Sequence, residues 1–222
     1  MERNISMDEI SDGKLYDLND MVKANCQNCE GCSACCQGMG SSIILDPLDI
    51  YQLEKNLEVT FEGLMAERIE LNVVDGVILP NLKMAGKKEA CSFLNEEGRC
   101  SIHGFRPGIC RLFPLGRFYE NNSFQYFLQV HECKKENRSK VKVSRWIDTP
   151  DLKKNQKFVC DWHYFQKDVQ NVLKSTQNDE LIKKINMYVL NQFFVAPYDT
   201  DTDFYEQFDG RMTAARKMLF GE

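Results

Sequence analysis

Five of the chain's ten cysteines lie within eleven residues, in the run Cys26-x2-Cys29-x2-Cys32-x2-Cys35-Cys36. A spacer of two residues lets the backbone turn so that successive thiolates face one ion, and such steps occur in both zinc and iron–sulfur sites. The adjacent pair at the end of the run fits two different metals, or two irons of one cluster, because neighbouring side chains usually diverge. The run therefore predicts a metal or cluster centre rather than a set of buried thiols.

A second group holds Cys91, Cys100 and Cys110, in a stretch that ends Cys110-Arg-Leu-Phe-Pro114. The turn residues from Asn95 to Gly98 allow Cys91 and Cys100 to meet across a loop. A proline at position 107 can start the short helical turn that carries Cys110. The order of this group behind the first one predicts that both contribute ligands to a shared centre.

Three further side chains of this stretch are candidate partners of the centre. Arg106 and Arg111 flank Cys110, and guanidinium groups lower the cost of bundled thiolates and favour the deprotonated ligands. His103 follows Cys100 by three residues and can either ligate the metal or donate a hydrogen bond to a sulfur or carbonyl. We favour the hydrogen-bonding role, and therefore assign Arg106, Arg111 and His103 to cofactor binding.

The two motifs together resemble the YkgJ-like cysteine-cluster family, a zinc- or iron-chelating CxxCxxCC domain. The resemblance covers about residues 26–135. The family pattern implies a metal-ligand set of eight cysteines, which here are Cys29, Cys32, Cys35, Cys36, Cys91, Cys100, Cys110 and, at the later single position, Cys133. Cys26 precedes the pattern and can complete a site or act as a resolving thiol. Cys160 lies outside the pattern and is expected to be an ordinary buried thiol.

The family resemblance implies metal binding more firmly than any reaction. The centre would be an iron–sulfur cluster, which the consecutive spacing slightly favours, or zinc; a cluster would permit redox chemistry and zinc would be structural. Longer relatives are linked to methylation of flagellin lysines, so a protein-modifying enzyme is the alternative, although no nucleotide or hydrolase motif is present. No residue is assigned a catalytic role.

The composition limits the class of partner. The chain has 222 residues, of which 43% are hydrophobic and 27% charged, and its net charge is −5. These values are typical of a soluble globular protein and argue against a general nucleic-acid binder. No targeting signal or span of about 18 apolar residues is visible, which predicts a cytoplasmic protein with reduced thiols and no membrane association.

One basic segment departs from this acidic balance. Residues 111–146 contain eight basic and three acidic residues, and the densest part runs from Lys134 to Arg145. The segment could contact an anionic partner, but we favour a solvated face that balances the charge of the thiolates.

The expected fold class is α+β, with a small cysteine-rich core, short β-hairpins and a helical C-terminal region. We predict an N-terminal extension over residues 1–25, the metal-binding domain over 26–150 and helices over 151–222 that can dock a protein partner. Hairpins are expected at Asp75-Gly76 and Asn121-Asn122. Helices are expected over about 15–22, 47–56, 61–72, 161–194 and 203–219.

Overall fold

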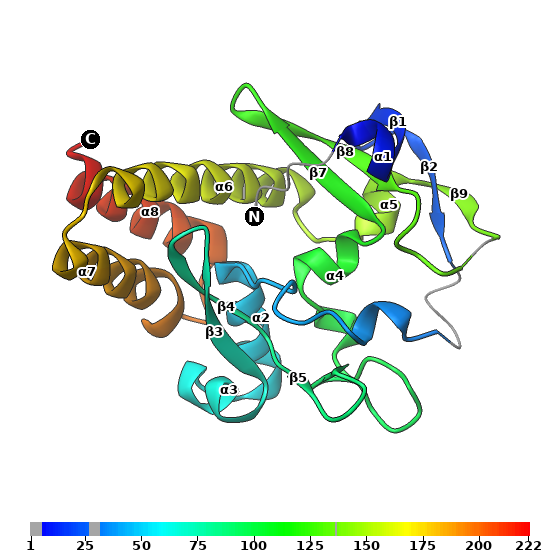
Figure 1. Ribbon diagram of the computed structural model, residues 1–222, viewed down its shortest axis with the longest axis horizontal. Coiled ribbons are helices and arrows are strands. Elements are labelled where there is room, and N and C mark those ends of the chain that lie inside the picture. The colour runs from blue at the N-terminus through cyan, green and yellow to red at the C-terminus, as the bar shows by residue number, and fades with distance from the viewer. Residues whose placement is uncertain (1–5, 27–31, 136) are drawn as a thin grey trace. The chain divides into compact units, whose positions relative to one another are not determined.

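The structure is a computed structural model that describes residues 6–26, 32–135 and 137–222. Helices and small antiparallel sheets are both present, which confirms the α+β class (Figure 1). The described chain divides into two compact units, each built from segments that are distant in sequence. The helical unit contains residues 44–83 and 153–222, and the cysteine unit contains the described residues up to 43 together with 84–152. The three consecutive domains expected from the sequence stay a prediction.

The helical unit consists of one β-hairpin and several helices. Its elements are α2 (Pro47–Leu57), α3 (Phe61–Glu67), β3 (Ile69–Val74), β4 (Val77–Leu82), α7 (Asp179–Leu190), the π-helical turn η4 (Asn191–Val195), α8 (Phe204–Phe220) and α6 (Leu152–Ser175), which starts at the last residue of the cysteine unit. The hairpin turns at Asp75 and Gly76, whose φ angles of 50° and 91° suit a tight two-residue turn. Asp46 starts α2 through a reciprocal capping box with Asp49.

Aromatic rings form the core of the helical unit. Phe158 and Phe165 of α6, Phe193 of η4 and Phe208 of α8 are fully buried. The rings of Phe158 and Phe208 meet edge to face, with centroids 4.6 Å apart. The predicted C-terminal helices therefore bury their apolar sides against each other.

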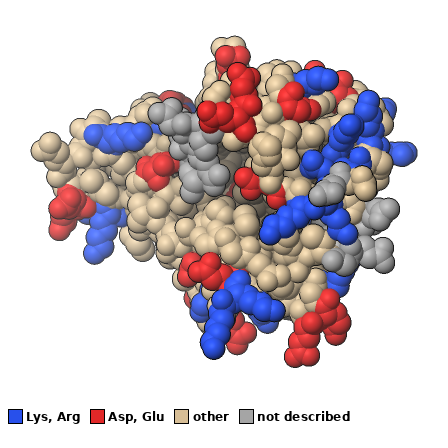
Figure 2. Space-filling model, turned by 45° about the vertical axis from the view of Figure 1, so that its right-hand side comes forward, with Lys and Arg blue, Asp and Glu red and all other residues tan. Residues whose placement is uncertain are grey.

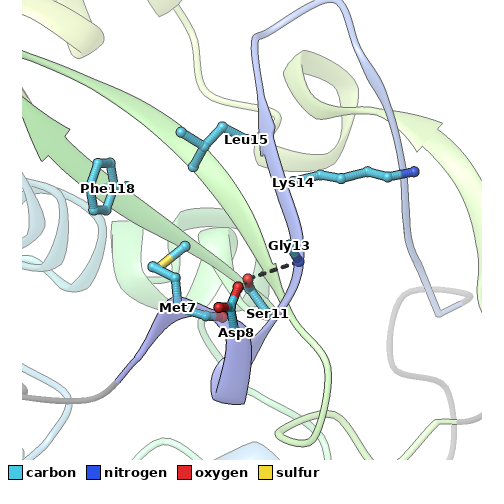
Figure 3. Close-up of a pocket in the computed structure, with 7 residues that line it drawn as sticks. All are labelled: Met7, Asp8, Ser11, Gly13, Lys14, Leu15 and Phe118. Atoms are coloured by element: carbon cyan, nitrogen blue, oxygen red, sulfur yellow. Dashed lines mark hydrogen bonds between the residues drawn. The ribbon is translucent and has the colours of Figure 1, made fainter.

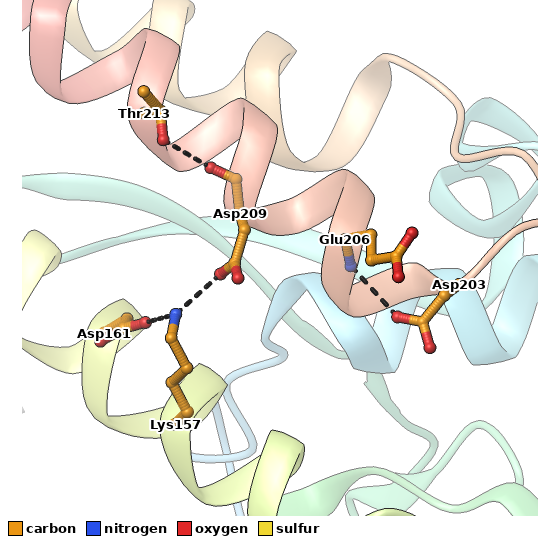
Figure 4. A network of polar contacts seen from close by, with 6 residues as sticks. All are labelled: Lys157, Asp161, Asp203, Glu206, Asp209 and Thr213. Carbon is orange, nitrogen blue, oxygen red and sulfur yellow. Dashed lines mark hydrogen bonds and ion pairs between the residues drawn. The ribbon is translucent and has the colours of Figure 1, made fainter.

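Polar contacts link α6 to α8 outside this core. Lys157 donates to Asp161 on its own helix at 2.7 Å and to Asp209 on α8 at 2.9 Å (Figure 4). Asp203 caps α8 by accepting the backbone N–H of Glu206 at 3.1 Å. Because the Lys157 side chain is 60% exposed, these ion pairs contribute little stability compared with the aromatic core.

The described residues of the cysteine unit form three small sheets. The largest has the strand order β1 (Ser11–Tyr16), β8 (Ser123–Gln129), β7 (Leu115–Glu120); β2 (Met21–Asn25) pairs with β9 (Ser139–Lys142), and β5 (Met84–Ala85) pairs with β6 (Ala90–Cys91). Short helices complete the unit: α1 (Met7–Ile10), η2 (Ala34–Cys36), η3 (His103–Phe105), α4 (Gly108–Leu112) and α5 (Val143–Ile147). Its core includes Val22 of β2, Leu112 of α4, Leu128 of β8 and Ile147 of α5.

A bulge in β1 opens a hollow of about 130 Å³ beside α1, shown in Figure 3. The Ser11 hydroxyl donates to the Met7 carbonyl at 2.7 Å and accepts the Gly13 N–H at 3.1 Å. Gly13 has a φ of +73°, which lets β1 turn here. None of the described residues that line the hollow is a cysteine.

Three expected helices differ from the structure. The helix expected over 161–194 begins earlier, at Leu152, and residues 176–178 divide it into α6 and α7. The helix expected over 15–22 is wrong, because β1 and β2 occupy this region and a turn closed by the Asp20 N–H on the Asp17 carbonyl separates them. Val22 and Ala24 are buried while their neighbours are not, which is the alternation of a strand. The helix expected over 61–72 ends at Glu67, and β3 begins at Ile69. The hairpin expected at Asn121-Asn122 is confirmed, with φ angles of 51° and 54°.

Glu54 of α2 gives the helical unit a pH-dependent stability. Burial raises the pKa of its carboxyl from 4.5 to about 7, against the lowering effects of the Phe61 backbone N–H and of Arg211. Between these two pH values the folded state binds the proton more strongly than the unfolded state. The free energy of unfolding therefore falls as the pH rises from 4.5 to about 7.

We predict that Glu54→Gln removes this fall in the free energy of unfolding, because the amide is neutral at every pH and can still accept the Phe61 N–H. The variant should melt higher than the wild type at pH 8, and this difference should shrink at pH 5. Circular dichroism melts at the two pH values measure it. Glu67→Gln, at a side chain that is 74% exposed, is the control. A melting difference that is equal at both pH values would contradict the assignment.

Candidate metal centre

Backbone pairing brings the two cysteine motifs together. Gln37 forms an isolated antiparallel bridge with Ala90, and the Gly38 N–H donates to the Glu89 carbonyl at 3.0 Å. These pairs place the residue after Cys36 against the residue before Cys91. The link is made by main-chain groups and joins positions more than fifty residues apart in the sequence.

A tight loop then carries the chain from Cys91 to Cys100. Leu94 pairs with Cys100, and the Asn95 side chain accepts the Arg99 N–H at 2.7 Å. Gly98 has a φ of +69°, and a Cβ atom at Gly98 would lie 3.9 Å from the Ser33 hydroxyl oxygen. The tip of this loop therefore lies beside the residue that precedes η2, so the two motifs also meet here.

The adjacent thiols Cys35 and Cys36 lie in the single turn η2 and are hydrogen-bonded to each other. The hydrogen bond from Cys36 lowers the pKa of Cys35 to about 7, even though burial acts in the opposite direction. The same bond, burial and the neighbouring thiols Cys35, Cys100 and Cys91 strongly raise the pKa of Cys36. Four thiols from the two motifs therefore share one electrostatic environment.

The pKa of the Cys100 thiol reflects effects that act in opposite directions. Burial raises the pKa of its thiol, while the Ile102 backbone N–H and the guanidinium of Arg106 act to lower it. The same guanidinium acts to lower the pKa of Cys35. Arg106 is thus the cation that the structure places within range of both motifs.

His103 contacts Arg106 rather than a thiol. Its Nε2 lies 3.0 Å from Arg106 Nη1. Burial and the nearby arginines lower the pKa of His103 and so favour the neutral imidazole, whose unprotonated nitrogen can accept this hydrogen bond. Arg106 Nε is buried and has no hydrogen-bond partner among the described residues, which leaves one donor of the guanidinium unused.

Arg111 makes a different set of contacts. Its guanidinium donates to the carbonyl of Gly104 and, at 3.1 Å, to the carbonyl of Asp148. These contacts tie α4 to η3 and to the end of α5. In the described structure Arg111 therefore braces the backbone around Cys110.

The remaining predicted ligands are spread over the unit. Cys32 is half-buried just before η2, Cys110 lies in α4, and Cys133 lies in the loop between β8 and β9. Cys29 lies outside the described residues. No three His, Cys, Asp or Glu side chains of the described ranges stand close enough to hold one ion between them.

The two cysteines outside the predicted ligand set lie in different places. Cys26 is buried directly after β2 in the cysteine unit. Cys160 lies within α6 in the helical unit, where burial raises the pKa of its thiol. The chain therefore offers Cys160 as an internal control for any experiment on the motif cysteines.

The donor set fits a thiophilic metal. Bundled thiols cannot all ionise in one buried place unless a cation compensates the charge, and a bound metal ion reverses this penalty by deprotonating its ligands. Thiolates select zinc, iron–sulfur clusters or copper(I) over magnesium or calcium. The chemistry of the four neighbouring thiols and the adjacent arginine therefore agrees with a zinc or iron centre.

Two residues that position the thiols, Ser33 and Gln37, were not predicted from the sequence. Gln37 pairs through its backbone with Ala90, and its side-chain amide donates to the Ser33 hydroxyl at 2.9 Å. Ser33 and Gln37 flank η2, so this contact closes the turn that carries Cys35 and Cys36. The sequence signal that could have indicated this role is the presence of a polar side chain on each side of the Cys35–Cys36 pair. The turn at Asn95 to Gly98 was expected and is present.

Comparison with known proteins finds a family match for the cysteine-rich part of the chain. Residues 28–134 match the family model CxxCxxCC, described as "Putative zinc- or iron-chelating domain". This part of the chain is therefore a domain of that zinc- or iron-chelating family, as the resemblance implied. No curated protein and no solved structure matched the chain. Among the described helices, none combines the length and the apolar character that a membrane crossing requires.

We predict that Gly98→Val weakens metal binding without removing a thiol. A β-branched residue is strained at a φ of +69°, so the loop tip should shift away from Ser33 and misplace Cys100. The affinity for zinc, measured by competition with a chromophoric chelator, should fall by about 10-fold to 100-fold, as for other residues that orient metal ligands.

Gly13→Val is the matched control, because Gly13 has a similar φ of +73° in the same unit but lies in the β1 bulge. Equal loss of affinity in both variants would show that backbone strain, rather than the position of the Cys91–Cys100 loop, sets the affinity.

Proposed function

We propose that the chain is a metal-binding protein whose centre is held by thiolates from both cysteine motifs. The observation that carries the proposal is the Gln37–Ala90 backbone bridge, which places the first motif against the second. In this proposal Cys35, Cys36, Cys91 and Cys100 form the heart of the ligand set. Cys29, Cys32, Cys110 and Cys133 complete it when the metal is bound.

The surrounding residues have supporting roles in this proposal. Arg106 compensates part of the thiolate charge, and His103 orients Arg106 through its imidazole. Arg111 holds α4, and with it Cys110, against neighbouring backbone carbonyls. The binding of a cation would draw the thiols into closer contact, since metal binding and local folding are coupled.

The identity of the metal determines what the centre does. An iron–sulfur cluster would support electron transfer or a redox reaction, and the adjacent Cys35–Cys36 pair fits ligation of two irons. Zinc would instead hold the two motif loops together as part of the structure. We propose the redox role, with a reducing cytoplasmic location that keeps the thiols available. Anaerobically purified protein that is coloured and contains iron and acid-labile sulfide would support it, and colourless protein with stoichiometric zinc would contradict it.

Single substitutions test the ligand set. We predict that Cys36→Ser and Cys100→Ser each lose most of the bound metal, because each removes a thiolate from a different motif of the same centre. Metal per chain is measured by mass spectrometry after anaerobic purification. Circular dichroism at the same concentration shows whether each variant keeps its helices.

Cys160→Ser is the matched control and should keep the wild-type metal content, because Cys160 lies in the helical unit. If either motif variant keeps full metal content, its cysteine is not a ligand. If only one motif is needed, the shared centre proposed here is wrong.

A further inference from the structure

A solvent-facing group of cations lies on the ribbon formed by β2 and β9. In β2, Val22 and Ala24 are buried, so Met21 and Lys23 face outward. In β9, Val141 belongs to the inner side, and Lys140 and Lys142 are exposed. Arg145 of α5 is also exposed. We call Lys23, Lys140, Lys142 and Arg145 the basic face.

The cations of the basic face have no acidic partner in the part of the chain that the structure describes. None of the four makes an ion pair with the residues that the structure describes. Arg138, one residue before β9, has its Nη1 buried without a hydrogen-bond partner in the described chain. Figure 2 shows Lys and Arg side chains gathered on the right, the side on which β2 and β9 lie in Figure 1. Like charges held together repel one another, so this face favours the approach of an anion.

The basic face also contains a surface hollow. A hollow of about 500 Å³ is lined by Met21 and Asn25 of β2, by Lys140, Val141 and Lys142 of β9, and by Arg145. Met21 is 48% exposed and stands opposite Lys142 in the strand register. The hollow therefore offers an apolar contact at Met21 with cations around it. It suits a ligand that carries an apolar group close to a negatively charged group.

The strand pairing indicates the form of the partner. β9 pairs only with β2 among the described strands, so its other edge has no strand partner in the described chain. An exposed edge can accept an extended peptide through main-chain hydrogen bonds. Lysines on such a ribbon disfavour pairing with a neutral or basic strand, because their positive charges would remain uncompensated. Pairing is favoured when the incoming segment carries negative charges. An acidic segment meets this requirement.

We propose that the basic face binds an extended acidic segment of a partner protein. A protein segment fits better than single-stranded nucleic acid, because none of the described residues that line the hollow is aromatic and could stack on bases. The chain's net charge of −5 also opposes general attraction of nucleic acid. The face requires none of the motif thiols, so the proposal is independent of the metal centre.

The test uses the metal-loaded 222-residue chain and a fluorescein-labelled peptide that alternates glutamate and valine. Fluorescence anisotropy should show binding that weakens as salt increases, since exposed ion pairs are screened. Lys140→Glu/Lys142→Glu should reduce the affinity by about tenfold or more through the reversed charge. Lys183→Glu/Lys184→Glu changes the charge equally at two exposed positions on α7 and should bind the peptide as the wild type does.

Competition decides between the two classes of partner. A matched peptide that alternates glutamine and valine should not bind, and an oligodeoxythymidylate of equal charge should not displace the acidic peptide. Displacement by the oligonucleotide at lower concentration would overturn the proposal in favour of nucleic acid. Equal loss of binding in both lysine double variants, or no loss in either, would also overturn it. Circular dichroism and metal content confirm that the variants are folded.

Discussion

The cost of holding several thiols close together is the constraint on which the cysteine unit depends. The hydrogen bond with Cys35 and burial strongly raise the pKa of Cys36, and the charges of Cys35, Cys100 and Cys91 raise it further. Arg106 offsets part of this cost, but one guanidinium cannot compensate four thiolates. A multivalent metal centre can, which supports the proposal that these thiols are metal ligands. Membership of residues 28–134 in a zinc- or iron-chelating family agrees with this argument.

Backbone geometry, more than side-chain packing, brings the thiols together. The Gln37–Ala90 and Leu94–Cys100 bridges set the positions of Cys36, Cys91 and Cys100. Both bridges are isolated pairs, and Ala90 belongs to a strand of only two residues, β6, so these segments have few ladder hydrogen bonds of their own. The cysteine unit therefore contains little regular structure near the thiols, and metal ligation would supply cohesion that strands and helices supply in the helical unit. The helical unit instead relies on buried rings such as Phe158 and Phe208.

Local signals predicted much of the fold. Asp46 and Thr60 mark the starts of α2 and α3, and Asp75-Gly76 marks the first hairpin, because caps and tight turns depend on a few adjacent residues. The strands near Val22 were missed, since their short alternation is set by packing against α4 and α5, which no local pattern reveals. The pairing of Gln37 with Ala90 joins distant segments, so the sequence predicted that the cysteine motifs meet but not how.

X-ray absorption fine structure at the edge of the bound metal tests the central claim most directly, because it reports the donor atoms without perturbing them. For the anaerobically purified 222-residue chain, we predict a first shell of sulfur alone, at about 2.3 Å for zinc. An iron centre should show the same sulfur shell together with iron–iron scattering. A first shell dominated by nitrogen or oxygen would contradict the claim that the clustered cysteines of both motifs hold the metal.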